Sequence, residues 1–118
     1  GGLPAGTPPQ ATPGPVAISE DVKRQLAFEI MAGTVVTILN DASKDTQEAA
    51  EQALAFLETG APEMVDQLRA WNKAGGVDGV LNTLAALPVL KVIPTHPRGR
   101  EFVTIFLREA ELPPAAVN

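Results

Sequence analysis

Cysteine and tyrosine are absent from this chain of 118 residues, and histidine and tryptophan occur once each, as His96 and Trp71. Without cysteine the chain cannot form a disulfide scaffold, a thiolate metal site or a thiol nucleophile. One histidine leaves at most one member for a Ser-His-Asp triad or a multi-histidine metal site. We therefore expect a non-enzymatic protein with no catalytic residue, no metal site and no cofactor.

Positive charge is in deficit. Nine Lys and Arg residues stand against fourteen Asp and Glu residues, which gives a formal net charge of −5 and a pI near 4.7. Non-specific binding to nucleic acid or to an anionic membrane needs clustered Lys and Arg side chains. No apolar run approaches the roughly 20 residues of a membrane span. We expect neither a nucleic-acid partner nor a membrane-spanning segment.

The first eighteen residues differ in composition from the rest of the chain. They carry no charged side chain and contain five of the eleven prolines, which fix φ and remove hydrogen-bond donors. Such a composition is typical of an extended, mobile segment. We predict a flexible Pro/Gly-rich leader or linker over residues 1–18, a helical bundle domain over 19–112 and a flexible tail over 113–118.

The central part of the chain predicts an all-α fold. Its apolar residues recur mainly at steps of three and four, as in amphipathic helices, and are mostly alanine, leucine and valine. An aromatic content of 4% also favours helix packing over a β-sandwich. We expect a compact bundle of four to five short helices. The predicted helices cover residues 20–40, 46–58, 62–74, 77–87 and 98–112.

Capping residues mark the starts of the first two helices. Ser19 precedes two acidic residues, as an N-cap precedes the carboxylates of a first helical turn. Asp45 and Glu48 form an acidic version of the capping box. Within the first helix, Gly33 and the β-branched run after it are weak points. We expect a kink or break there.

Three prolines interrupt the segment between the fourth helix and the last one, at Pro88, Pro94 and Pro97. Residues 89–93 are too apolar to remain in water, so they form either a short helical turn packed on the core or an extended segment laid across it. The structure of residues 88–98 stays open between these two. Large apolar side chains cover more than half of the circumference of the last predicted helix, and we expect it to be central.

The scarce aromatic and histidine side chains favour ordinary structural roles. His96 lies between two prolines, and a solvent-facing loop histidine is favoured there over an axial haem ligand or a catalytic base. Met64 and Trp71 are seven residues apart on one predicted helix. Few other aromatic residues are present to build a core, so we expect these two in the core rather than in a ligand cage.

Charged residues supply the candidates for binding a partner. Glu48, Glu51 and Glu58 share one face of a predicted helix. They form a solvated acidic face or a surface for a basic partner protein, because a cation site or a carboxylate pair would need groups from a second element. Arg98 and Arg100 lie near the start of the last helix. There they either bind an anion or pair with the protein's own carboxylates. The acidic set is our preferred site.

Residues 48–60 read EAAEQALAFLETG. This segment resembles the Ala-Leu-Phe (ALF) helical repeats of secreted actinobacterial proteins, which have alanine and leucine at similar steps and a Phe-Leu-x-x-Gly ending. The resemblance covers thirteen of the 118 residues. It implies an exported, non-enzymatic helical module.

These features predict a helical module for protein–protein interaction or assembly, with a protein partner. The alternative is a helical carrier that holds a lipid-like or hydrophobic small ligand in an apolar interior, since short side chains and Pro-broken segments leave room for one. A filled core would favour the module, and an apolar cavity of several hundred Å³ would favour the carrier. The first residue, Gly1, indicates a processed or trimmed chain. We expect a secreted or cell-surface location rather than a cytoplasmic one.

Overall fold

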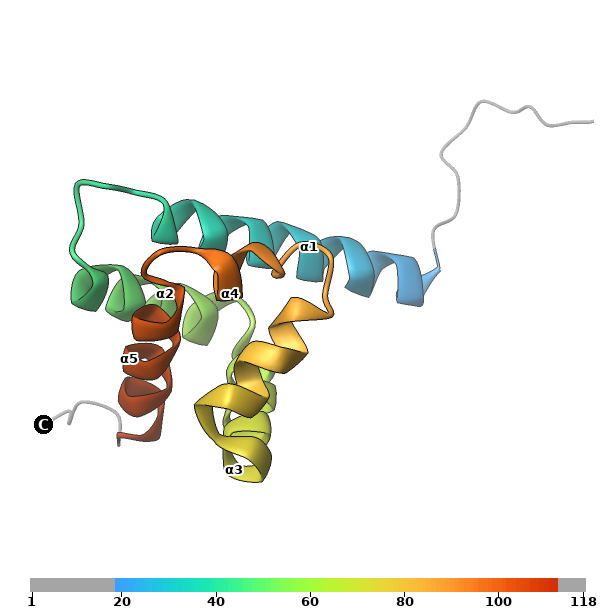
Figure 1. Ribbon diagram of the computed structural model, residues 1–118. Coiled ribbons are helices and arrows are strands. Elements are labelled where there is room, and N and C mark those ends of the chain that lie inside the picture. Colours follow the sequence, from blue (N-terminus) through green and yellow to red (C-terminus); the bar gives the residue numbers. More distant parts are fainter. Residues whose placement is uncertain (1–18, 113–118) are drawn as a thin grey trace, which may run out of the picture.

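The computed structural model describes residues 19–112, and the predicted leader and tail lie outside these residues. Within them the fold is all-α, with no strand, and forms a compact bundle (Figure 1). The predicted fold class is therefore confirmed. The helices are α1 (Glu20–Leu39), α2 (Thr46–Gly60), α3 (Pro62–Ala85), α4 (Val92–Thr95) and α5 (Gly99–Glu111). None of these helices is long and apolar enough to span a lipid bilayer.

Helix α1 begins where its cap predicts but does not kink. The Ser19 hydroxyl accepts a hydrogen bond from the Val22 N–H at 3.2 Å, and the helix continues through Gly33 to Leu39. The expected break at Gly33 is therefore wrong. Glycine costs a helix interior about 1 kcal/mol, and burial of Val35 and Leu39 on the core outweighs that cost.

The apolar residues of α1 change sides along the helix. Val22, Leu26 and Ile30 are 46%, 47% and 68% exposed, whereas Val35 and Leu39 are buried. At 3.6 residues per turn, the exposed row lies on nearly the opposite side of the helix from the buried residues. In Figure 1 the first turns of α1, in blue, extend beyond the other helices. The buried residues of α1 thus all lie in its second half, and Phe28 packs against the core from the first half.

Helix α2 follows its predicted capping box. The Asp45 Oδ1 atom accepts a hydrogen bond from the Glu48 N–H at 2.8 Å. The helix continues to Gly60, two residues beyond the predicted end. Its buried face consists mostly of alanine, whose small side chains let α1 and α5 pack closely against α2. The buried residues are Ala49, Ala50, Ala53, Leu54 and Leu57.

Helix α3 consists of two limbs joined at Gly76, which correspond to the third and fourth predicted helices. Gly76 has φ 70° and ψ −169°, a backbone conformation that side chains with a Cβ atom rarely adopt. In Figure 1 the second limb folds back beside the first. This reversal lets both limbs face the same space beneath α1.

The segment after α3 is helical and packed on the core. Its turns lead into the short helix α4, and Leu90 and Ile93 are buried. The helical-turn alternative for residues 88–98 is therefore the one observed. Helix α5 contacts α2, α3 and α4, and its central position is confirmed. Its buried residues are Gly99, Phe102, Val103, Ile105, Phe106, Leu107 and Ala110.

Candidate functional site: an apolar pocket

An apolar pocket of about 310 Å³ lies between α1, α2, both limbs of α3, α4 and α5. All but two of the residues that line it are apolar, and the two exceptions are Glu63 and Gln67 on the first limb of α3. Deep in the pocket the lining residues are fully buried, as Ala32 and Val80 are at 0% exposure. Towards the surface they are partly exposed, as Trp71 is. The pocket is therefore open to solvent on one side.

Local sequence explains why the core leaves this space. The turn at Gly76 separates the two limbs of α3, so that they line opposite parts of the pocket. Short side chains face it from α1, α3 and α5, at Ala32, Val80 and Val103. Four of the five aromatic residues of the chain line the pocket without filling it: Phe28, Trp71, Phe102 and Phe106. Helix packing alone therefore leaves the pocket unfilled by the protein's own side chains.

The size of the pocket decides how much an occupant would matter. An empty apolar cavity costs about 24 cal/mol per Å³, so a cavity of this volume would cost about 7 kcal/mol if it were sealed and empty. That is comparable to the total stability of a small domain, about 5–15 kcal/mol. An apolar cavity of about 150 Å³ holds a benzene molecule. A pocket twice as large suits a hydrophobic group of about ten to twelve carbon atoms.

Met64 and Trp71 are pocket residues. The sequence favoured core positions for both, and each is partly buried and packs against the core. Each also lines the pocket together with Leu68, which the sequence did not indicate, because residues 64, 68 and 71 form an apolar row in either case. Their spacing cannot show whether the space that the row faces is filled by protein. Trp71, as the single tryptophan, provides a spectroscopic probe of that space.

The predicted acidic site lies on the outer face of α2. Glu48, Glu51 and Glu58 are exposed, and none of them lines the pocket. Glu51 Oε2 accepts a hydrogen bond from the Gln47 side chain at 2.7 Å. Glu58 Oε2 lies 4.0 Å from the Arg69 guanidinium on α3. The three carboxylates thus share a rigid surface, as their spacing indicated.

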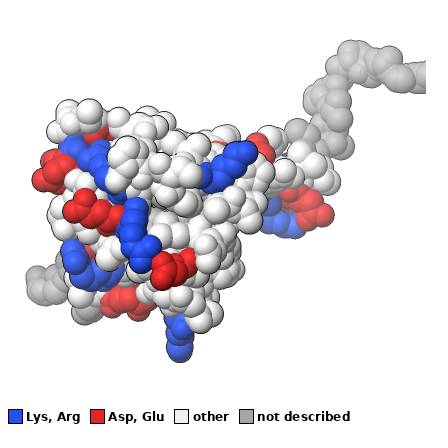
Figure 2. All heavy atoms as spheres, viewed as in Figure 1, with Lys and Arg blue, Asp and Glu red and all other residues white. Residues whose placement is uncertain are grey.

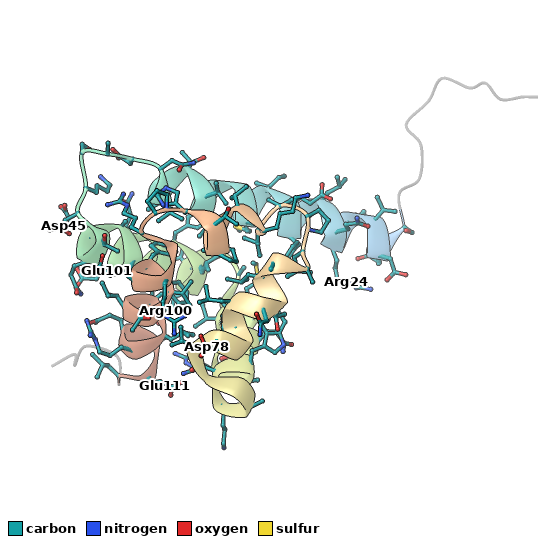
Figure 3. All side chains as sticks on the ribbon, in the orientation of Figure 1. Arg24, Asp45, Asp78, Arg100, Glu101 and Glu111 are labelled. Atoms are coloured by element: carbon teal, nitrogen blue, oxygen red, sulfur yellow. The ribbon has the colours of Figure 1, made fainter. Side chains whose placement is uncertain are left out.

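The two predicted basic residues are engaged with different parts of the fold. The Arg98 guanidinium donates hydrogen bonds to the carbonyl oxygens of Leu39, Asp41 and Lys44. The Arg100 guanidinium forms an ion pair with Asp78 on α3 at 2.8 Å (Figure 3). Figure 2 shows basic and acidic side chains next to one another on this face. The Arg100 contact fits pairing with the protein's own carboxylates, whereas Arg98 binds backbone carbonyl oxygens, which neither alternative anticipated.

His96 also links the segment before α5 to the end of α1, as Arg98 does. Its Nδ1 atom accepts a hydrogen bond from the Arg98 N–H at 3.1 Å, and its Nε2 atom lies 3.0 Å from Asn40 Oδ1. A neutral ring with its hydrogen on Nε2 satisfies both contacts. The prediction of a solvent-facing loop histidine is wrong, since the ring is partly buried and bonded on both sides. Its two hydrogen bonds hold the loop in place, and His96 does not line the pocket.

Asp41 lies in the turn between α1 and α2, and its contacts change the pKa of its carboxyl group. Asp41 Oδ1 accepts hydrogen bonds from the Ser43 hydroxyl at 2.6 Å and from the Ser43 N–H at 3.0 Å. These bonds, together with the nearby Lys44 ammonium, lower the pKa of Asp41 below its usual 3.8.

Between residues 19 and 112 no three His, Asp or Glu side chains are grouped to hold a metal ion.

Comparison with protein-family models, with curated proteins and with solved structures finds no match. The resemblance of residues 48–60 to ALF repeats therefore stays a prediction. The pocket is the feature of the described residues that sequence reasoning located least well. Only the general observation of short side chains and Pro-broken segments pointed to it.

Proposed function

We propose that this protein is a non-enzymatic helical carrier that binds a hydrophobic small ligand in the pocket beneath α1. The observation that supports this proposal is the continuous pocket of about 310 Å³ with almost wholly apolar walls. Its volume falls at the lower end of the range for small-molecule sites, about 300–1,000 Å³. Space of this kind favours the carrier over a module with a filled core.

The expected affinity follows from the area that the ligand removes from water. Burial contributes about 0.8 kcal/mol per methylene, so a ten-carbon chain gains about 8 kcal/mol. That would correspond to a Kd of about 1 μM before the entropic cost of binding. We therefore expect micromolar to submillimolar affinity for a simple ten-carbon probe, and tighter binding for a ligand with matched polar contacts.

The first test is a titration with n-decanol, which has no charge. Trp71 lines the pocket, so its emission should shift in a saturable way, and calorimetry should give one site per chain. A matched exposed-surface variant, Glu48→Gln, should bind as the wild type does, because Glu48 does not line the pocket. Absence of both heat and emission change up to the solubility limit of decanol would contradict the proposal.

A protein-interaction module is the second candidate. It is supported by the exposed carboxylates of Glu48 and Glu51, which α2 presents on a rigid surface. The partner would be a basic protein, attracted mainly through long-range electrostatics. Association with a protein recovered from the native source should slow in Glu48→Lys/Glu51→Lys and become less sensitive to salt. Unchanged association rates at low salt would rule out the acidic surface.

A further inference from the structure

Two polar residues lie at the mouth of the pocket, one acidic and one uncharged, and none is basic. Glu63 and Gln67 lie one turn apart on the first limb of α3, and both side chains are exposed. They are the two polar residues among those that line the pocket, and no Lys, Arg or His residue is in that set. Glu63 is therefore the charged residue among the described residues that line the pocket, and its exposed side chain lies at the edge of the apolar walls.

The neighbouring basic side chains are engaged elsewhere. Arg24, one turn before the pocket residue Phe28 on α1, forms an ion pair with Asp21 at 2.6 Å. Arg69, two residues after Gln67 on α3, donates to the Ala110 carbonyl oxygen and to Asp66. In residues 19–112 no salt bridge includes Glu63. Glu63 lies in the first turn of α3, where the helix dipole favours a carboxylate, and no basic side chain of the described residues pairs with it.

Lys91 is the basic residue that could oppose this assignment. It is exposed and follows Leu90, which lines the pocket. Lys91 is not among the residues that line the pocket, whereas Glu63 is. A negatively charged ligand would have to reach past the apolar wall to Lys91 and would meet the Glu63 carboxylate at the mouth. Lys91 is therefore included in the test.

An amphiphile can enter this pocket in one orientation. Its hydrocarbon part gains from burial, while a charged head group would lose several kcal/mol of hydration inside. The head group therefore stays at the mouth, beside Glu63 and Gln67. There a protonated amine is attracted to the carboxylate, and a fatty-acid carboxylate is repelled by it. The Gln67 amide can accept a hydrogen bond from the same amine.

We propose that the ligand is a cationic amphiphile, with one hydrocarbon part of about ten to twelve carbon atoms in the pocket and an ammonium head group on Glu63. This inference rests on the proposed carrier function and adds the class of ligand. Attraction of one head group and repulsion of the other separate their affinities. At low ionic strength we expect decylammonium to bind about tenfold more tightly than decanoate.

The experiment compares three ten-carbon probes that differ in the head group: decylammonium, n-decanol and decanoate. Binding is measured by calorimetry and by Trp71 emission at pH 7.5 in low salt, below the concentration at which the probes form micelles. The expected order of affinity is decylammonium, then decanol, then decanoate. In 0.5 M NaCl the charged probes should approach each other in affinity, because an exposed carboxylate is screened.

Two variants at the mouth and two matched controls assign the effect to Glu63. Glu63→Gln should remove most of the tenfold preference, and Glu63→Lys should reverse it. Glu101→Gln, an exposed glutamate on α5 outside the pocket, should keep the wild-type preference. Lys91→Gln should also keep it. Circular dichroism and thermal unfolding show that each variant retains the fold.

The outcomes separate this inference from the carrier function. If none of the probes binds, the carrier function itself fails. If decanol binds but decanoate binds as tightly as decylammonium, the cationic head group is wrong and the carrier function stands. If decanoate binds best and Lys91→Gln weakens it, the ligand is anionic and the assignment to Glu63 is overturned. If probe binding is saturable only in a dimer seen by sedimentation, the pocket is a contact between two copies, and both proposals fail.

Discussion

The Arg98 guanidinium lies 2.7 Å from the carbonyl oxygen of Leu39, a residue 59 positions earlier in the chain. Leu39 is the last residue of α1, so its carbonyl has no acceptor role inside the helix. The same guanidinium reaches Asp41 and Lys44 in the turn that follows. One side chain thus fixes the end of α1 and the turn into α2 against the start of α5.

Replacing Arg98 should therefore destabilise the fold. Arg98→Ala leaves carbonyl groups of a partly buried turn without donors, and we expect a loss of about 2–3 kcal/mol in the free energy of unfolding. Arg100→Ala is the matched control. Its ion pair with Asp78 is 65% and 75% exposed, so the loss there should stay below about 1 kcal/mol. Urea unfolding of both variants measures the difference, and equal losses would contradict the structural role of Arg98.

Three glycines should respond differently to the same substitution. A Cβ atom on Gly99 would collide with the Ile93 carbonyl oxygen, whereas nothing lies within 4 Å of one on Gly33. Gly99→Ala should unfold the domain or cost more than about 4 kcal/mol. Gly33→Ala should stabilise α1 by about 0.5–1 kcal/mol. Gly76→Ala should be destabilising because of its positive φ.

Thermal unfolding followed by circular dichroism measures all three glycine variants. A Gly99→Ala variant with the wild-type melting temperature would show that α4 and α5 do not approach as closely as described. A Gly33→Ala variant that melts earlier than the wild type would show that α1 needs a flexible point there after all.

Most of the helices could be predicted from the sequence because their signals are local. Each signal acts within a few residues, as the helix caps at Ser19 and Asp45 and the helix break at Gly76 do. The unbroken passage of α1 through Gly33 could not be predicted, because burial of Val35 against other helices decides it. A propensity difference of about 1 kcal/mol is too small to resist such packing.

The candidate site was predicted only in part, for a related reason. The sequence shows that Glu48, Glu51 and Glu58 share a face, because spacing along one helix is enough for that. A pocket arises instead from the distance between elements. The row that contains Met64 and Trp71 looks the same whether it faces packed side chains or open space. Likewise, the bonds of Arg98 depend on carbonyl oxygens far away in the chain.

Acidification should remove a stabilising contribution from Asp41. Its pKa in the folded state is lowered by the hydrogen bonds from Ser43 and by the Lys44 ammonium. The folded value lies below the unfolded one, near 3.8. The contribution is therefore fully present above the unfolded pKa and is lost as pH falls through the folded pKa. Wild type should exceed Asp41→Asn in stability at pH 6, and the gap should narrow as pH falls below the unfolded pKa and close below the folded one.

Unfolding by urea at a series of pH values between 2.5 and 7 measures this gap. Ser43→Ala removes the hydroxyl donor but keeps the N–H donor, so it should reproduce part of the Asp41→Asn effect. A gap between wild type and Asp41→Asn that is constant over the whole series would show that the Asp41 contacts do not depend on its ionisation.

The last prediction concerns two buried alanines that differ only in what they face. Ala32 and Ala50 are both 0% exposed. Ala32 lines the pocket, whereas Ala50 lies on the buried face of α2 and does not line it. Leucine at position 50 has no free volume to enter, so Ala50→Leu should destabilise the domain by about 1–3 kcal/mol. Leucine at position 32 can extend into the pocket, where it fills space and buries apolar area.

Ala32→Leu should therefore keep or raise the free energy of unfolding while it weakens the binding of a ten-carbon probe at least tenfold, because three added carbon atoms take up volume that the probe needs. Urea unfolding and decanol calorimetry on the same preparations test both effects. Higher stability together with weaker binding distinguishes a pocket from a packed core. A leucine forced into a filled core lowers the stability of the domain as well as the binding of the probe. If Ala32→Leu destabilises the domain as much as Ala50→Leu does, the space beneath α1 is occupied by protein, and the carrier function loses its supporting observation.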